Sequence, residues 1–129
     1  MKKNILLLSI LLIGFALLTN SCKKDDDPET KTCNLIKSDT LDTDMALVFT
    51  VVKTGDANCT KITYSIAGSE QILTNPTLPW TLSSSGEAGN AIALTADATT
   101  TNGSISISIT GNSASSSLSL SESCSQYND

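Results

Sequence analysis

The chain has 129 residues, with eight lysines, no arginine and no histidine against thirteen acidic residues. Its net charge of −5 disfavours nucleic-acid binding, because phosphate contacts need a basic face and arginine side chains. The absence of histidine removes the commonest general base and metal ligand, and it excludes a Ser-His-Asp triad. We therefore expect a non-catalytic protein without cofactor or metal site, and without a nucleic-acid partner.

The first segment has the pattern of a secretory signal. Lys2 and Lys3 precede an apolar stretch of fourteen residues, Ile5 to Leu18, and the small residue Ser21 stands directly before Cys22. This stretch is too short for a stable transmembrane helix, which needs about 20 residues. We expect residues 1–21 to be removed, leaving six lysines against thirteen acids, a net charge of −7.

The residues around Cys22 resemble a bacterial lipoprotein signal, although Thr19 stands where leucine is usual. Cys-Lys-Lys-Asp-Asp-Asp at residues 22–27 is similar to the start of many lipoproteins of the Bacteroidetes. The resemblance implies an acylated Cys22 that anchors the protein in the outer membrane, with the acidic run as an export signal to the cell surface. The alternatives are a solvated spacer with the domain on the periplasmic face, or a secreted protein with an unacylated Cys22.

Residues 22–44 are expected to form a tether rather than part of the main domain. Residues 23–32 contain no apolar side chain except Pro28, which is typical of disorder. Cys33–Ile36 could form a short edge strand, and Ser38–Asp44 is acidic and turn-like without the spacing of an EF-hand. An Asp-Thr-Leu sequence places Thr40 in a pattern that resembles the O-glycosylation site of Bacteroidetes envelope proteins.

Residues 45–129 show period-two apolarity, β-branched residues and frequent turns, which predict a sandwich or barrel of antiparallel strands. A Ser/Thr-rich stalk at the C-terminus is the alternative, but stalks lack isoleucine and leucine at every second position. We predict seven strands, around Leu47–Val51, Ile62–Ile66, Gln71–Thr74, Trp80–Leu82, Ile92–Leu94, Ser104–Ile109 and Leu118–Leu120. The predicted core contains Leu47, Phe49, Ile62, Tyr64, Ile66, Leu94, Ile105, Ile107, Ile109, Leu118 and Leu120.

Asn-Pro-Thr-Leu-Pro-Trp at residues 75–80 lies between the strand that ends at Gly68 and the Gly-x-Ile-x-Ile-x-Ile strand from Gly103 to Ile109. This order resembles the soluble domain of the MmpS family of small mycobacterial membrane proteins, over roughly residues 46–124. The resemblance implies a seven-stranded, immunoglobulin-like β-sandwich that serves as an accessory to a large membrane transporter. The chain departs from the family in its lipidated anchor, and in having Ile105 where a cysteine usually pairs with one at the position of Cys124.

The Leu78-Pro79-Trp80 sequence is either a structural turn or a partner-binding element, since Pro79 fixes φ and Trp80 supplies a large apolar body. We therefore expect a non-catalytic, lipid-anchored envelope protein that contacts another protein, such as a transport component. The alternative is a surface lipoprotein that binds glycan or lipid through exposed loops such as Ser83–Asn90.

Three cysteines remain if Cys22 is acylated, enough for one disulfide. In an immunoglobulin topology, Cys59 is expected at the opposite pole from Cys124, so that pairing is geometrically poor. An edge strand would bring Cys33 near Cys59, whereas a loop at residues 33–44 would let Cys33 reach Cys124. We favour a Cys33–Cys59 disulfide.

Overall fold

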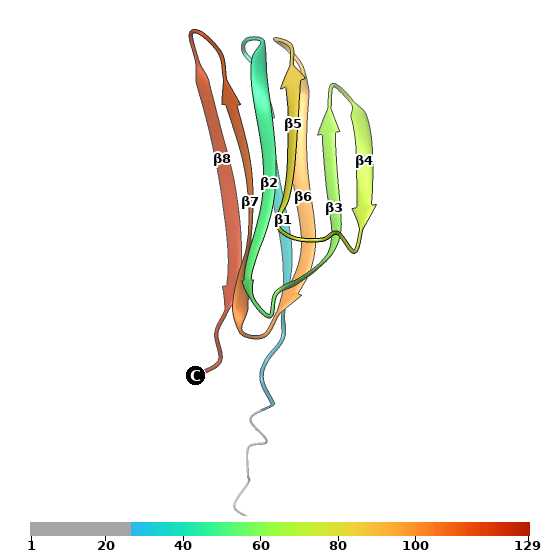
Figure 1. Cartoon of the computed structure of the whole chain (residues 1–129), viewed down its shortest axis with the longest axis vertical. Coiled ribbons are helices and arrows are strands. Elements are labelled where there is room, and N and C mark those ends of the chain that lie inside the picture. Colours follow the sequence, from blue (N-terminus) through green and yellow to red (C-terminus); the bar gives the residue numbers. More distant parts are fainter. Residues whose placement is uncertain (1–26) are drawn as a thin grey trace, which may run out of the picture.

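The computed structural model describes residues 27–129 (Figure 1). The predicted signal peptide, Cys22 and the run from Lys23 to Asp26 lie outside the described residues. No helix in the described part of the chain is long and apolar enough to cross a membrane.

The described chain folds into eight antiparallel strands in two four-stranded sheets packed as a sandwich. One sheet has the strand order β1-β6-β3-β4, and the other has the order β5-β2-β7-β8 (Figure 1). The strands are β1 (Lys31–Thr40), β2 (Met45–Gly55), β3 (Asn58–Ile66), β4 (Ser69–Thr74), β5 (Trp80–Gly86), β6 (Ala91–Thr100), β7 (Gly103–Asn112) and β8 (Ser117–Gln126).

The core lies between the two sheets and follows the alternation of the sequence. In β7, Ile105, Ile107 and Ile109 are fully buried, while the intervening serines lie on the outer face. Burial of one such side chain stabilises the fold by about 1.5–3 kcal/mol. The predicted core is confirmed: seven of its members are buried, and Tyr64, Ile66, Leu118 and Leu120 are partly buried against them.

The structure has eight strands rather than the predicted seven, because β1 is a complete strand and not a short edge segment. It pairs with β6 from Lys31↔Thr100 to Thr40↔Ala91, so residues 38–40 are extended and not turn-like. Cys33 and Leu35 face the core, whereas Asn34 and Ile36 face solvent. Only two buried side chains mark this strand, which is why its periodicity is weak in the sequence.

Asn-Gly at residues 102–103 is a sequence typical of a hairpin turn, but the turn between β6 and β7 crosses from one sheet to the other and does not join paired strands. Asp56 holds this turn through Oδ1, which accepts hydrogen bonds from Thr100 Oγ1 (2.9 Å), Thr101 N (3.0 Å) and Asn102 N (2.8 Å). These bonds, that from Asn102 above all, lower the pKa of the Asp56 carboxyl. A side chain thus satisfies the backbone donors that a hairpin would have paired.

The disulfide joins Cys33 to Cys124, with 5.9 Å between the Cα atoms, so the favoured Cys33–Cys59 pairing is wrong. Cys33 and Cys59 both lie opposite Ala98, on either side of β6. Two strand spacings of about 4.8 Å place their Cα atoms about 9.6 Å apart, beyond the limit of about 7 Å for a bridge.

The expectation that Cys59 and Cys124 lie at opposite poles of the sandwich is also wrong. Gly55 at the end of β2 pairs with Gly103, which pairs with Gln126 at the end of β8. The turn before Cys59 and the end of β8 therefore lie at the same pole. Cys33 and Cys124 instead meet because β1 and β8 are the edges of the two sheets on the same side of the sandwich.

Candidate functional site at the pole opposite the chain ends

Both ends of the described chain leave the sandwich at one pole, as Figure 1 shows for the segment before β1 and for the C-terminus. The opposite pole carries the loops at residues 41–44, 67–68, 87–90 and 113–116. We call it the distal pole. It includes much of the Ser83–Asn90 segment that the sequence suggested as a contact surface.

A pocket of about 400 Å³ opens at the distal pole, where β2 begins and β5 and β7 end. Its position follows from the register, because Ala46 of β2 pairs with Ser85 on one side and Asn112 on the other. Met45, which is 7% exposed, is the most buried apolar side chain of its lining. The pocket is lined by Asp44, Met45, Ala46, Ser85, Gly86, Glu87, Asn112, Ser113 and Ala114.

Hydrogen bonds between two loops hold the rim of this pocket. Leu41 N donates to Asn90 O (3.0 Å), and Gly89 N donates to Leu41 O (2.7 Å). Asp44 Oδ1 accepts a hydrogen bond from Ala88 N (2.8 Å). These contacts fix the 41–44 loop against the 87–90 loop before any ligand binds.

The polar groups of the pocket are mostly hydrogen-bond acceptors. Asp44 and Glu87 contribute carboxylates, Asn112 an amide, and Ser85 and Ser113 hydroxyls. The arrangement suits a ligand or a partner side chain that donates hydrogen bonds. Residues 27–129 contain no group of three or more His, Cys, Asp or Glu side chains placed to hold a metal ion.

The Leu78-Pro79-Trp80 sequence lies where the connection from β4 ends and β5 begins at Trp80, away from the distal pole. The peptide bond between Leu78 and Pro79 is cis, and Leu78 and Trp80 pack against the core. The Trp80 ring lies 5.5 Å from that of Tyr64, which lies 6.1 Å from that of Phe49. This row of rings gives the Trp80 side chain a packing role.

The remaining candidate residues do not line the pocket. Thr40 is exposed at the end of β1, where its backbone N–H donates to Asp39 Oδ1 (2.8 Å). Cys59 is a buried free thiol beside the Lys61 carbonyl (3.5 Å), and burial raises its pKa. A buried thiol with a raised pKa is a poor nucleophile.

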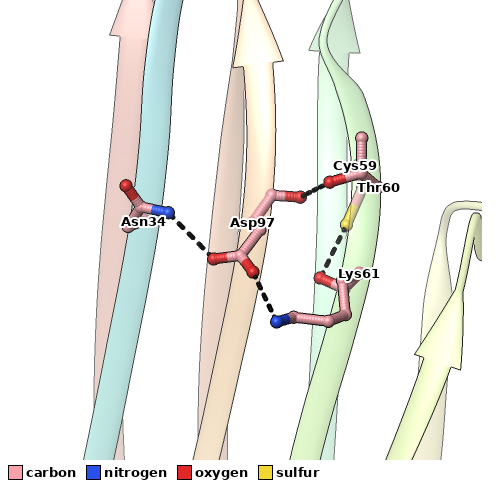
Figure 2. Close-up of polar contacts among 5 residues, drawn as sticks. All are labelled: Asn34, Cys59, Thr60, Lys61 and Asp97. Atoms are coloured by element: carbon pink, nitrogen blue, oxygen red, sulfur yellow. Dashed lines mark hydrogen bonds and ion pairs between the residues drawn. The ribbon is translucent and has the colours of Figure 1, made fainter.

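A polar cluster on the outer face of the first sheet joins three strands (Figure 2). Asp97 of β6 accepts hydrogen bonds from Asn34 Nδ2 of β1 (2.9 Å) and Lys61 Nζ of β3 (3.0 Å). These two contacts, that from Asn34 first, lower the pKa of the Asp97 carboxyl. Thr60, at an irregularity in β3, donates to the Asp97 carbonyl (3.1 Å). The cluster is largely exposed, and an ion pair of this kind contributes at most about 1 kcal/mol.

No protein-family model matches this sequence, and no curated protein or solved structure gives a significant match to it.

Sequence reasoning did not find the pocket or the Asp97 cluster. Asp44 was visible as part of an acidic segment, but its pocket partners Ser85 and Asn112 are distant in sequence and neutral. Asn34 and Asp97 are 63 residues apart. Only the strand order, which periodicity does not determine, brings these residues together.

Proposed function

We propose that this protein is a non-catalytic, lipid-anchored envelope protein that presents its distal pole to a protein partner, as an accessory to a membrane transporter or as another interaction module. Acylated Cys22 would hold it in the outer membrane, on the cell-surface or periplasmic face. The observation that supports this role is the placement of both chain ends at one pole and of the pocket at the other.

The dimensions support the same arrangement. An antiparallel strand rises about 3.4 Å per residue, so a ten-residue strand such as β6 is about 34 Å long. A domain tethered at the pole where its chain ends leave would therefore hold the pocket well away from the lipid headgroups. The acidic tether would not bind an anionic surface, which leaves the covalent lipid as the anchor.

The transporter-accessory role rests on the MmpS resemblance, and fold alone does not establish function. The strand pairs are compatible with the immunoglobulin-like core that this resemblance implies. In immunoglobulin domains strand B pairs with E, and C pairs with F, as β2 pairs with β5 and β3 with β6 here. β1, beside β6, would then occupy the position of strand G, and β7, beside β2, would occupy the position of strand A.

Site-specific photocrosslinking in the native envelope tests the proposed contact surface. A photoreactive residue at Glu87, on the pocket rim, should crosslink a defined protein that is recovered with the lipidated chain. The matched control places the same residue at exposed Asn58, near the chain ends, and should not give this product. Equal products from both positions, or none from either, would contradict a distal contact surface.

The pocket itself favours a second candidate function, binding of a glycan or a lipid headgroup. Its carboxylates, amide and hydroxyls can accept hydrogen bonds from sugar hydroxyls. Saturable binding on a glycan or lipid array that is lost in Asn112→Ala, without a crosslinked protein at Glu87, would favour this function over the first.

A further inference from the structure

Charge is unevenly distributed between the distal pole and the rest of the described chain. The loops of the distal pole contain three acidic residues, Asp42, Asp44 and Glu87, and no lysine. All lysines of residues 27–129 lie on strands and none lines the pocket: Lys31, Lys37, Lys53 and Lys61. A partner that approaches the distal pole therefore meets a negative surface.

The two carboxylates that line the pocket are not neutralised by the described part of the chain. Asp97, on the outer face of the first sheet, has Lys61 Nζ at 3.0 Å. Within residues 27–129, neither Asp44 nor Glu87 forms an ion pair of this kind. The pocket thus keeps two negative charges that a cationic group of a partner can neutralise.

Both carboxylates belong to one side of the rim. Asp44 Oδ1 accepts a hydrogen bond from Ala88 N (2.8 Å), and Ala88 directly follows Glu87 in the chain. This bond fixes the Asp44 carboxylate and leaves its second oxygen for a ligand. Three neutral side chains of the lining add further oxygen acceptors: Ser85, Asn112 and Ser113.

The rest of the pocket lining is apolar and small. Met45 is 7% exposed, and Ala46, Gly86 and Ala114 complete this part of the wall. Arginine and lysine side chains pack an apolar stem against such a surface while their charged end stays among polar groups. An acidic rim beside an apolar wall therefore suits a long cationic side chain rather than a small cation.

We propose that the distal pocket binds an arginine side chain of the protein partner, an inference that rests on the proposed function. A guanidinium group has five N–H donors in a planar fork and is less strongly hydrated than an ammonium group. It can bond to Asp44, Glu87 and the neutral oxygens together, whereas the three donors of lysine radiate from one atom. The stem packs against Met45 and Ala46, and about 400 Å³ is within the range of pockets that bind small ligands.

Peptide titration of the full lipidated chain in neutral detergent tests the pocket directly. With acetyl-Gly-Gly-Arg-Gly-Gly-amide as the probe, NMR should show saturable shifts of the Ala88 and Asn112 amide signals. The affinity should fall up to about fivefold in Asp44→Asn and in Glu87→Gln, and it should also fall with added salt. Glu122→Gln removes a charge away from the pocket and is the matched control, so it should bind like the parent chain.

A second variant separates the shape of the pocket from its charge. Ala46 has an exposed side chain that lines the pocket, so Ala46→Phe fills the pocket and leaves both carboxylates in place. Peptide binding should be lost in this variant while its circular dichroism matches the parent chain. Absence of binding to the parent chain, binding that persists in Ala46→Phe, or equal affinity for the peptide with lysine in place of arginine overturns the proposal.

Crosslinking in the native envelope separates this proposal from the proposed function. A photoreactive residue at Ser113, in the pocket lining, should give the same partner product as one at Glu87. Combining the Ser113 probe with Asp44→Asn and Glu87→Gln should abolish the product. A product that persists in this combination overturns the arginine pocket and leaves the distal contact surface standing. No product from either probe position overturns the proposed function itself.

Discussion

The Cys33–Cys124 disulfide should supply a large share of the stability of this domain. The bridge joins positions 91 residues apart. In the chain-entropy model, a loop of this length stabilises the folded state by about 4.6 kcal/mol. Domains of this size have total unfolding free energies of about 5–15 kcal/mol. Replacing both cysteines by alanine should therefore lower the melting temperature by about 20 °C.

Thermal unfolding followed by circular dichroism measures this effect. The double variant Cys33→Ala/Cys124→Ala is compared with the parent chain, with and without reductant. Cys59→Ala serves as the control, since it removes a buried sulfur outside the bridge. Its melting temperature should still fall in reductant, as the parent's does, whereas that of the double variant should not respond to reductant. If the double variant melts within a few degrees of the oxidised parent, or if peptide mapping links Cys59, the reasoning is refuted.

Four other predictions concern the core, a turn, the anchor and the acidic run that follows it. Ile107→Asp buries a charge without a partner and should cost more than about 4 kcal/mol, measured as the loss of a cooperative urea transition. Because the pKa of Asp56 is lowered from 3.8, its contribution is complete above that pH and is lost as pH falls through the folded value; Asp56→Asn should therefore reduce the acid sensitivity of the urea midpoint. Cys22→Ser should abolish membrane retention in a fractionation assay. Alanine at residues 23–27 should protect the domain from protease added to intact cells, whereas equal digestion would make the run a spacer.

The core was predictable because its signal is local. Ile105, Ile107 and Ile109 alternate with serine, and this period-two pattern specifies both a strand and the face that it buries. Turn residues such as Gly68 then divide the chain into strands. The sandwich class and the members of its core follow from these two signals.

Strand order was not predictable, because it depends on pairing between distant segments. β1 contains only two buried side chains, Cys33 and Leu35, so its sequence resembles the polar tether before it. Its stability comes from β6 on one side and from the disulfide to β8 on the other. The predicted Cys33–Cys59 disulfide requires β1 and β3 to be adjacent strands, whereas β6 lies between them.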